Sequence, residues 1–150
     1  MSLQTYVKRT LIPASAEEVF AWHEAPGAFQ RLTPPWEKVR VVHHAGGIKD
    51  GADVRLLVGR MPFVLRWDLT HCDYQPGRSF TDRQVKGPFK QWTHVHRMLP
   101  RDDKTCLLED RIEYELPLGL FGALLGRFFM KRKLDRLFEY RHKITLQAFA

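Results

Sequence analysis

The pattern of apolar and polar residues along the chain changes its period near Pro117. Before this point, short apolar stretches alternate with polar residues, which is typical of strands with one buried face. Two segments in this part have helical spacing instead, and they predict short helices over Ala16–Glu24 and Ala28–Leu32. After Pro117, apolar residues recur at helical spacing from Leu120 to about Ala148, with charged residues on the other face. The C-terminal part is therefore predicted to be one long helix.

Local signals mark where these segments begin and end. A first strand over Gln4–Ile12 ends at Pro13, and Ser15 followed by Glu18 forms a capping box for the first short helix. Further strands are predicted between turn residues over Lys38–His44, Ala52–Arg60, Pro62–Asp73, Arg78–Val85, Phe89–Leu99 and Thr105–Leu116. Consecutive strands bounded by helices predict an α+β fold with a curved antiparallel sheet. Residues 1–150 are expected to form a single domain with one core.

Composition and charge limit the cellular locations and the binding partners that we expect. The chain has a net charge of +7 and two cysteines, too few for a disulfide framework in 150 residues. We expect a cytoplasmic protein, because no secretory signal is evident and the most apolar stretch, Leu116–Met130, is interrupted by proline, glycine and arginine. No nucleic-acid-binding motif is recognisable. Basic residues gather on the last helix, either as a solvated face or for transient contact with an anionic membrane. The oligomeric state is left open.

Three consecutive predicted strands each carry a row of chemically interesting residues on one face. Because side chains alternate along a strand, residues two apart point the same way. The rows comprise Phe80, Asp82 and Gln84, then Trp92, His94 and His96, then Asp110 and Tyr114. On a concave face, such polar groups among aromatic rings could orient a ligand or move protons. Two other interpretations stay open: the carboxylates only pair with the histidines, or this face lies in solvent.

Other chemistry finds less support in the sequence. His94 and His96 could reach one ion together with Asp82 or Asp110, but no cysteine pair or HExxH motif accompanies them. We therefore predict no metal site. No cofactor is predicted either, because no glycine-rich dinucleotide motif is present. Nucleophilic catalysis is not expected, since the few serines form no triad-like arrangement.

Three stretches give the chain a family resemblance. They are the helix entry Ile12–Phe20, the strand motif Phe80-x-Asp82-x-Gln84-x-x-Gly87-Pro88-Phe89-x-x-Trp92-x-His94-x-His96, and the ending Tyr114–Gly119 before a Phe-rich helix. With the order of elements, they make the chain resemble the START-like, or Bet v 1-like, superfamily, also labelled SRPBCC, which includes polyketide cyclase-like domains. It is similar to a bacterial stand-alone branch, relatives of which are fused to nucleotide-sugar-epimerase-like domains. The resemblance covers nearly the whole chain.

This resemblance implies a helix-grip fold, in which a seven-stranded sheet wraps the last helix around a cavity for lipids, polyketides or other apolar molecules. We expect a small apolar or amphipathic ligand as the partner. The expected walls are Phe63, Leu65, Trp67, Trp92, Phe121, Leu124, Phe128 and Phe138, and the expected polar contacts are Asp82, Gln84, His94, His96, Asp110 and Tyr114. The runner-up is a cyclase- or hydratase-like enzyme with His94 or His96 as general base on an enolisable substrate. A third alternative is an interaction module with a filled core.

Overall fold

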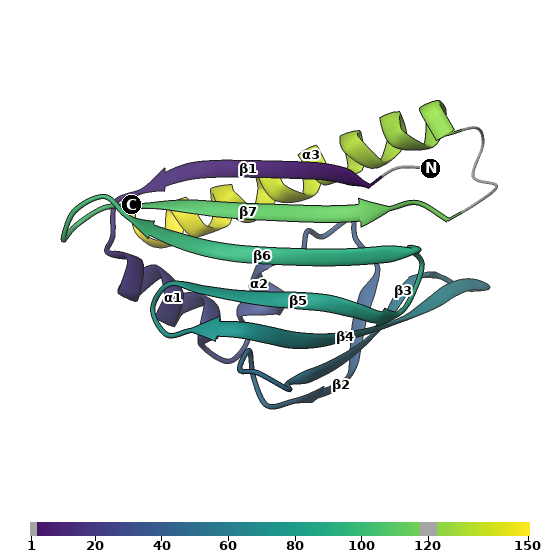
Figure 1. Ribbon diagram of the computed structural model, residues 1–150, viewed down its shortest axis with the longest axis horizontal. Coiled ribbons are helices and arrows are strands. Elements are labelled where there is room, and N and C mark those ends of the chain that lie inside the picture. The colour runs from purple at the N-terminus through teal and green to yellow at the C-terminus, as the bar shows by residue number, and fades with distance from the viewer. Residues whose placement is uncertain (1–2, 118–122) are drawn as a thin grey trace.

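One antiparallel sheet dominates the computed structural model, which describes residues 3–117 and 123–150. Its strand order is β1-β7-β6-β5-β4-β3-β2. Helices α1 (Ala16–Glu24) and α2 (Ala28–Leu32) follow β1, and the long helix α3 (Ala123–Ala148) follows β7 (Figure 1). The strands are β1 (Gln4–Ile12), β2 (Val39–Ala45), β3 (Asp53–Arg60), β4 (Phe63–Gln75), β5 (Ser79–Lys86), β6 (Gln91–Pro100) and β7 (Cys106–Glu115). The predicted α+β helix-grip fold, with two short helices after the first strand, is confirmed.

Sequence-local signals and one long-range pairing produce this topology. Strands β2 to β7 follow one another as antiparallel neighbours, whereas β1 pairs with β7, from Gln4 opposite Tyr114 to Ile12 opposite Cys106. The capping box is present at the start of α1. The Ser15 hydroxyl accepts a hydrogen bond from the Glu18 backbone N–H at 3.2 Å, and Glu18 Oε2 accepts one from the Ser15 backbone N–H at 2.9 Å. The chain therefore leaves β1 and enters α1 at a defined residue.

The core lies between the concave face of the sheet and the helices. Every second residue of β6 from Trp92 to Met98 is buried, as strand alternation requires. One apolar cluster packs where α1 meets the sheet, and a second packs where α3 crosses it. The second contains Tyr6, Trp92, Ile112, Tyr114, Leu134 and Phe138. The concave face is thus the one that carries the predicted rows of polar and aromatic residues.

Helix α3 grips the sheet with its C-terminal half. Leu134, Phe138 and Thr145 are buried there at helical spacing. The expectation that Leu124 and Phe128 also pack against the sheet is wrong, because their side chains are 81% and 56% exposed. Figure 1 shows the reason: the first turns of α3 rise away from the strands. Phe121 lies outside the described residues. Across residues 3–117 and 123–150, no helix is both long and apolar enough to cross a membrane.

Replacing a phenylalanine by alanine in each half of α3 should distinguish a position that packs against the sheet from one that is exposed to solvent. We expect Phe138→Ala to lower the free energy of unfolding by about 3–5 kcal/mol, because it removes a buried ring. The matched change Phe128→Ala should alter it by less than about 0.5 kcal/mol. Urea unfolding followed by circular dichroism measures both. Similar losses in the two variants would contradict this packing of α3.

Candidate functional site

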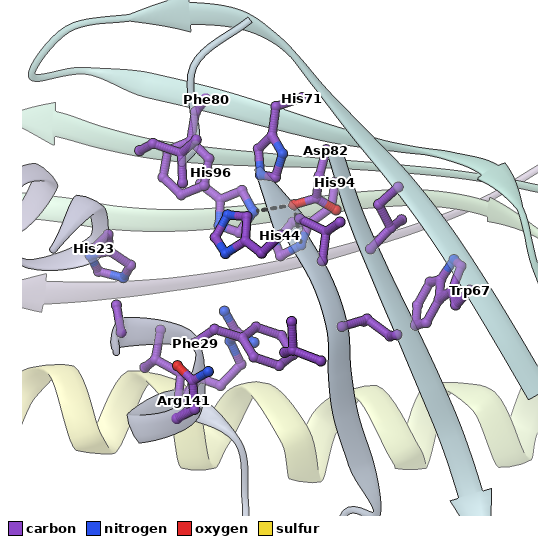
Figure 2. A pocket seen from close by; sticks show the side chains of 18 of the residues that line it. His23, Phe29, His44, Trp67, His71, Phe80, Asp82, His94, His96 and Arg141 are labelled. Carbon is purple, nitrogen blue, oxygen red and sulfur yellow. Dashed lines mark hydrogen bonds and ion pairs between the residues drawn. The ribbon is translucent and has the colours of Figure 1, made fainter. Parts of the chain in front are cut away.

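A cavity of about 190 Å³ lies between the concave face of the sheet and helices α2 and α3. Its apolar wall includes Leu56, Trp67, Leu69, Trp92, Leu137 and Phe138, and its polar lining includes His23, His44, His71, Asp82, His94, His96 and Arg141. Figure 2 shows the polar groups of the strands gathered on one side, with Arg141 on the side of the helix and His23 at one end. The cavity therefore combines an apolar wall with a polar floor on β5 and β6.

Strand register builds the centre of this floor. Asp82 on β5 lies opposite His94 on β6, and His96 on β6 lies opposite Asp110 on β7. Because directly opposed and diagonal side chains on one sheet face are within reach of each other, these four residues meet. We call them the Asp–His cluster. The imidazole rings of His94 and His96 lie one over the other with centroids 3.6 Å apart and planes tilted by 30°, and the two carboxylates flank them.

The hydrogen bonds of the cluster define the role of each ring nitrogen. A carboxylate only accepts, so the nitrogen facing it carries the proton. His94 Nε2–H donates to Asp110 Oδ1 at 2.6 Å, and His96 Nε2–H donates to Asp82 Oδ2 at 2.7 Å. His96 Nδ1 lies 3.2 Å from Asp110 Oδ1, whereas His94 Nδ1 is 3.7 Å from Asp82 Oδ2. His96 is therefore bracketed by two carboxylates, and His94 is bound closely at only one nitrogen.

These surroundings shift the pKa values of the two histidines in opposite directions. Burial lowers the pKa of His94, and the neighbouring His96 lowers it further, against the pull of the carboxylates. Burial also acts to lower the pKa of His96, but hydrogen bonds to Asp110 and Asp82 outweigh it and raise that pKa. Burial would raise the pKa of both carboxyl groups, yet the histidines lower it. These directions favour two ionised carboxyl groups, protonation of His96 and the neutral form of His94.

A second layer behind the cluster connects it to the long helix. His142 on α3 donates from Nε2 to Asp110 Oδ2 at 2.7 Å. Its Nδ1 lies 2.7 Å from the hydroxyl of Thr10 on β1, which donates to it when the ring is neutral. No sequence signal distinguishes His142, because a single histidine in a basic helix usually lies on the solvated face. Its role follows from tertiary packing alone.

Five further polar residues line the cavity and were not among the predicted site residues: His23, Gln30, His44, His71 and Arg141. His23 on α1 donates from Nδ1 to the Val19 carbonyl at 2.8 Å, and burial lowers its pKa to about 4. Burial also lowers the pKa of His71 and of Arg141. Two buried nitrogens, Trp67 Nε1 and His71 Nδ1, have no hydrogen-bond partner among the described residues. Helical spacing marked His23 as inward-facing, but no pattern pointed to His71 or Arg141.

The predicted site residues fall into three groups. Trp67, Asp82, Trp92, His94, His96 and Phe138 line the cavity. Gln84, Asp110 and Tyr114 do not: Gln84 holds the backbone of Phe89 through two hydrogen bonds, Asp110 lies behind the histidines, and Tyr114 packs on Trp92. The expected wall positions of Phe63, Leu65, Leu124 and Phe128 are wrong, since these side chains are exposed. Period-two alternation assigned Phe63 and Leu65 to a face but could not show that this part of β4 extends beyond the covered sheet.

The sequence was compared with the models of known protein families. Residues 12–139 match the family described as polyketide cyclase/dehydrase and lipid transport. The chain belongs to this family. The match runs from the last residue of β1 into α3, and it includes the whole Asp–His cluster and every cavity-lining residue except Arg141. No curated protein matches the sequence.

Solved structures from bacteria share the fold. A protein of Thermus thermophilus has 18% identity and a TM-score of 0.71, with 98% of this chain and 100% of that chain covered. The Zhui aromatase/cyclase of a Streptomyces species has 17% identity and a TM-score of 0.76, covering 98% and 93%. The nucleoside-diphosphate sugar epimerase of Corynebacterium glutamicum has 27% identity and a TM-score of 0.70 over 95% of this chain but 28% of its own. This fold therefore occurs both alone and within a longer protein.

Removing the buried charge of Asp110 should be far more costly than removing a surface charge. We expect Asp110→Asn to lower the free energy of unfolding by about 3–5 kcal/mol, because the histidines lose the buried negative charge and one of its two acceptor oxygens. Asp68→Asn is the matched control. Asp68 pairs with Arg55 and Arg66 at the surface, so its loss should cost less than about 1 kcal/mol. Chemical denaturation measures both, and equal costs would contradict the central structural role of Asp110.

The neutral His23 should make the fold sensitive to acid. Its pKa is lowered from 6.5 to about 4 in the folded protein, so between these pH values the unfolded chain binds a proton that the folded chain does not. Stability should therefore fall as the pH decreases from about 6.5 to 4, by roughly 3 kcal/mol in total at about 1.4 kcal/mol for each pKa unit.

The variant His23→Asn keeps an N–H for the Val19 carbonyl but cannot take up a proton. We expect its stability to decrease less than that of the wild type over the same pH range. The same substitution at the exposed His43 serves as the control. Denaturant unfolding at several pH values gives the result, and parallel pH profiles for wild type and His23→Asn would count against a buried neutral imidazole.

Proposed function

We propose that the protein binds a small amphipathic molecule of one or two rings in the cavity. The apolar body of the ligand packs between Trp67, Trp92 and Phe138, and its polar end contacts Asp82, His94 and His96. The family description, polyketide cyclase/dehydrase and lipid transport, supports an apolar or ring-forming ligand class. The domain at 1–150 acts in this proposal as one ligand-binding unit.

The size of the cavity favours ring compounds over long acyl chains. Its volume is about 190 Å³. An apolar cavity of about 150 Å³ holds benzene in another protein, whereas drug-sized ligands occupy pockets of roughly 300–1,000 Å³. A ligand with one or two rings therefore matches the space, and a membrane lipid would need the cavity to enlarge.

The observation that carries the proposal is the pair of unpartnered nitrogens in the cavity wall. Trp67 Nε1 carries a hydrogen and only donates, and His71 Nδ1 is buried beside the Asp–His cluster on β4; neither has a partner within the described chain. A buried polar atom without a partner costs about 1–3 kcal/mol. Once the Trp67 or His71 side chain turns toward the cavity, a ligand hydroxyl group would supply the missing partner, which a purely apolar ligand could not do.

The second candidate function is acid–base catalysis on an enolisable ring compound. The observation favouring it is the contrast between neutral His94, whose Nδ1 is 3.7 Å from the Asp82 carboxylate, and His96 between two carboxylates. A neutral imidazole can abstract a proton, and a neighbouring imidazolium can stabilise the resulting enolate. Aromatase/cyclase activity in a protein of the same fold is consistent with such chemistry.

Binding can be tested with 2-naphthol, a two-ring compound with one hydroxyl group. We expect calorimetric titration to show one site and an affinity roughly two- to tenfold higher than for naphthalene, because the hydroxyl group forms a hydrogen bond. Ala28→Leu fills part of the cavity and should weaken binding at least tenfold, whereas Ala21→Leu changes an exposed residue on α1 and should not. Equal binding by both variants would show that the probe binds elsewhere.

The catalytic alternative requires a different readout. Deuterium exchange at the enolisable carbon of 2-tetralone, followed by NMR, reports proton abstraction directly. His94→Gln keeps a hydrogen-bonding side chain but cannot titrate near neutral pH, whereas His94→Ala removes both properties. Binding alone predicts no exchange above the uncatalysed rate and retained affinity in the Gln variant. Catalysis predicts exchange in the wild type that is lost in both variants.

A further inference from the structure

Three side chains at the floor of the cavity present ligand atoms to one point. One atom each from Asp82, His94 and His96 lies within 4.8 Å of the other two. The nitrogens nearest Asp82 Oδ2 are His96 Nε2 at 2.7 Å and His94 Nδ1 at 3.7 Å. Ligand atoms bound to one ion at about 2.0–2.2 Å lie roughly 3–3.5 Å apart. No pair is more than 4.8 Å apart, so movements of about 1–2 Å with rotation of the rings would place all three around a single ion.

Hydrogen bonds to Asp110, on the side of the two rings away from Asp82, orient His94 and His96 for binding an ion. Asp110 Oδ1 accepts from His94 Nε2–H at 2.6 Å and lies 3.2 Å from His96 Nδ1. A carboxylate that holds the outer N–H of an imidazole fixes the ring orientation and directs the lone pair of the other nitrogen to a metal. Here one carboxylate serves both rings, and His142 holds its second oxygen at 2.7 Å. Asp110 thus occupies the position of an outer-shell partner.

We propose that Asp82 Oδ2, His94 Nδ1 and His96 Nε2 form a binding site for a divalent first-row transition-metal ion such as Zn²⁺, Co²⁺ or Fe²⁺. Imidazole nitrogens favour these metals over Mg²⁺ and Ca²⁺, which prefer oxygen ligands. The sequence offered His94 and His96 with either Asp82 or Asp110 as an ion-binding set, but it predicted no metal because no cysteine pair or HExxH motif is present. The strand register now selects Asp82 as the third ligand and places Asp110 behind the rings. The ion displaces the Nε2 proton of His96, which is released to solvent, so the hydrogen bond between His96 and Asp82 gives way to coordination of both atoms to the ion.

The site is placed for chemistry and not only for structure. Three protein ligands leave at least one coordination position open, as in catalytic metal sites, and all three residues line the cavity. His71 is paired with Asp82 in the strand register, and its buried Nδ1 has no partner in the described chain. A water molecule or a ligand oxygen on the ion would lie on this side of the cavity, where His71 is available to bind it. The proposal does not depend on the identity of the organic ligand.

Titration with Co²⁺ alone, after chelator treatment of the whole 150-residue chain, provides the test. We expect one ion per chain and intense visible absorption of a four- or five-coordinate site. The ¹H NMR spectrum of the Co²⁺ form should contain two strongly shifted, exchangeable ring N–H signals. One signal belongs to His94 Nε2–H, with the metal on Nδ1, and the other to His96 Nδ1–H, with the metal on Nε2. Both N–H groups stay beside the Asp110 carboxylate that accepts from them.

Asp82→Asn and His94→Gln remove a ligand while keeping the side-chain size, and each should weaken Co²⁺ binding at least about tenfold. His43→Ala removes an exposed histidine of β2 that does not line the cavity and should bind Co²⁺ like the wild type. Loss of binding in His43→Ala, unchanged binding in both ligand variants, or a wild-type spectrum without the two N–H signals would overturn the proposal. The wild-type spectrum alone decides the matter where a variant does not fold.

Discussion

A buried carboxylate must be neutralised and hydrogen-bonded, and much of this structure follows from how Asp110 meets that requirement. Its two oxygens accept from His94 on β6 and His142 on α3, and His142 in turn contacts Thr10 on β1. One residue of β7 therefore joins both neighbouring strands and the long helix. Apolar packing around Phe138 buries surface between α3 and the sheet, but such non-directional contacts do not by themselves fix where the helix lies along the sheet. The polar contacts fix the depth and rotation at which α3 lies on the sheet.

Stability alone does not explain such a cluster. Replacing a buried ionic group by well-packed apolar residues is often neutral or stabilising, although removing one partner is costly. An apolar core at this place would therefore match the Asp–His cluster in stability, even without fixing the depth and rotation of α3. The cluster also lines the cavity, with two nitrogens beside it that have no partner in the described chain. The combination is what a protein needs when the polar end of a bound molecule has to meet fixed donors and acceptors in a dry site.

The sequence revealed the parts of this site but not their assembly. Period-two alternation placed His94 and His96 on one face with Trp92, and the capping box at Ser15 located α1 to the residue. Nothing local could show which face is concave, or that Asp82 lies opposite His94, because register depends on the whole sheet. His142 and Arg141 were hidden in a basic helix. Phe63, Leu65, Leu124 and Phe128 were misplaced because periodicity identifies a face but not where its covering partner ends.

Charge balance connects the ligand and metal proposals. Asp82 and Asp110 contribute two negative charges to the site, and Arg141 together with His96 in the protonated form that its raised pKa favours would offset them with two positive charges. A divalent ion that displaces the proton between His96 and Asp82 would raise the net charge by one. An anionic oxygen on the organic ligand, such as a phenolate or enolate, would then restore neutrality while occupying the open coordination position. Metal binding would therefore select for ligands that can ionise, whereas the metal-free site favours neutral hydroxyl or carbonyl groups.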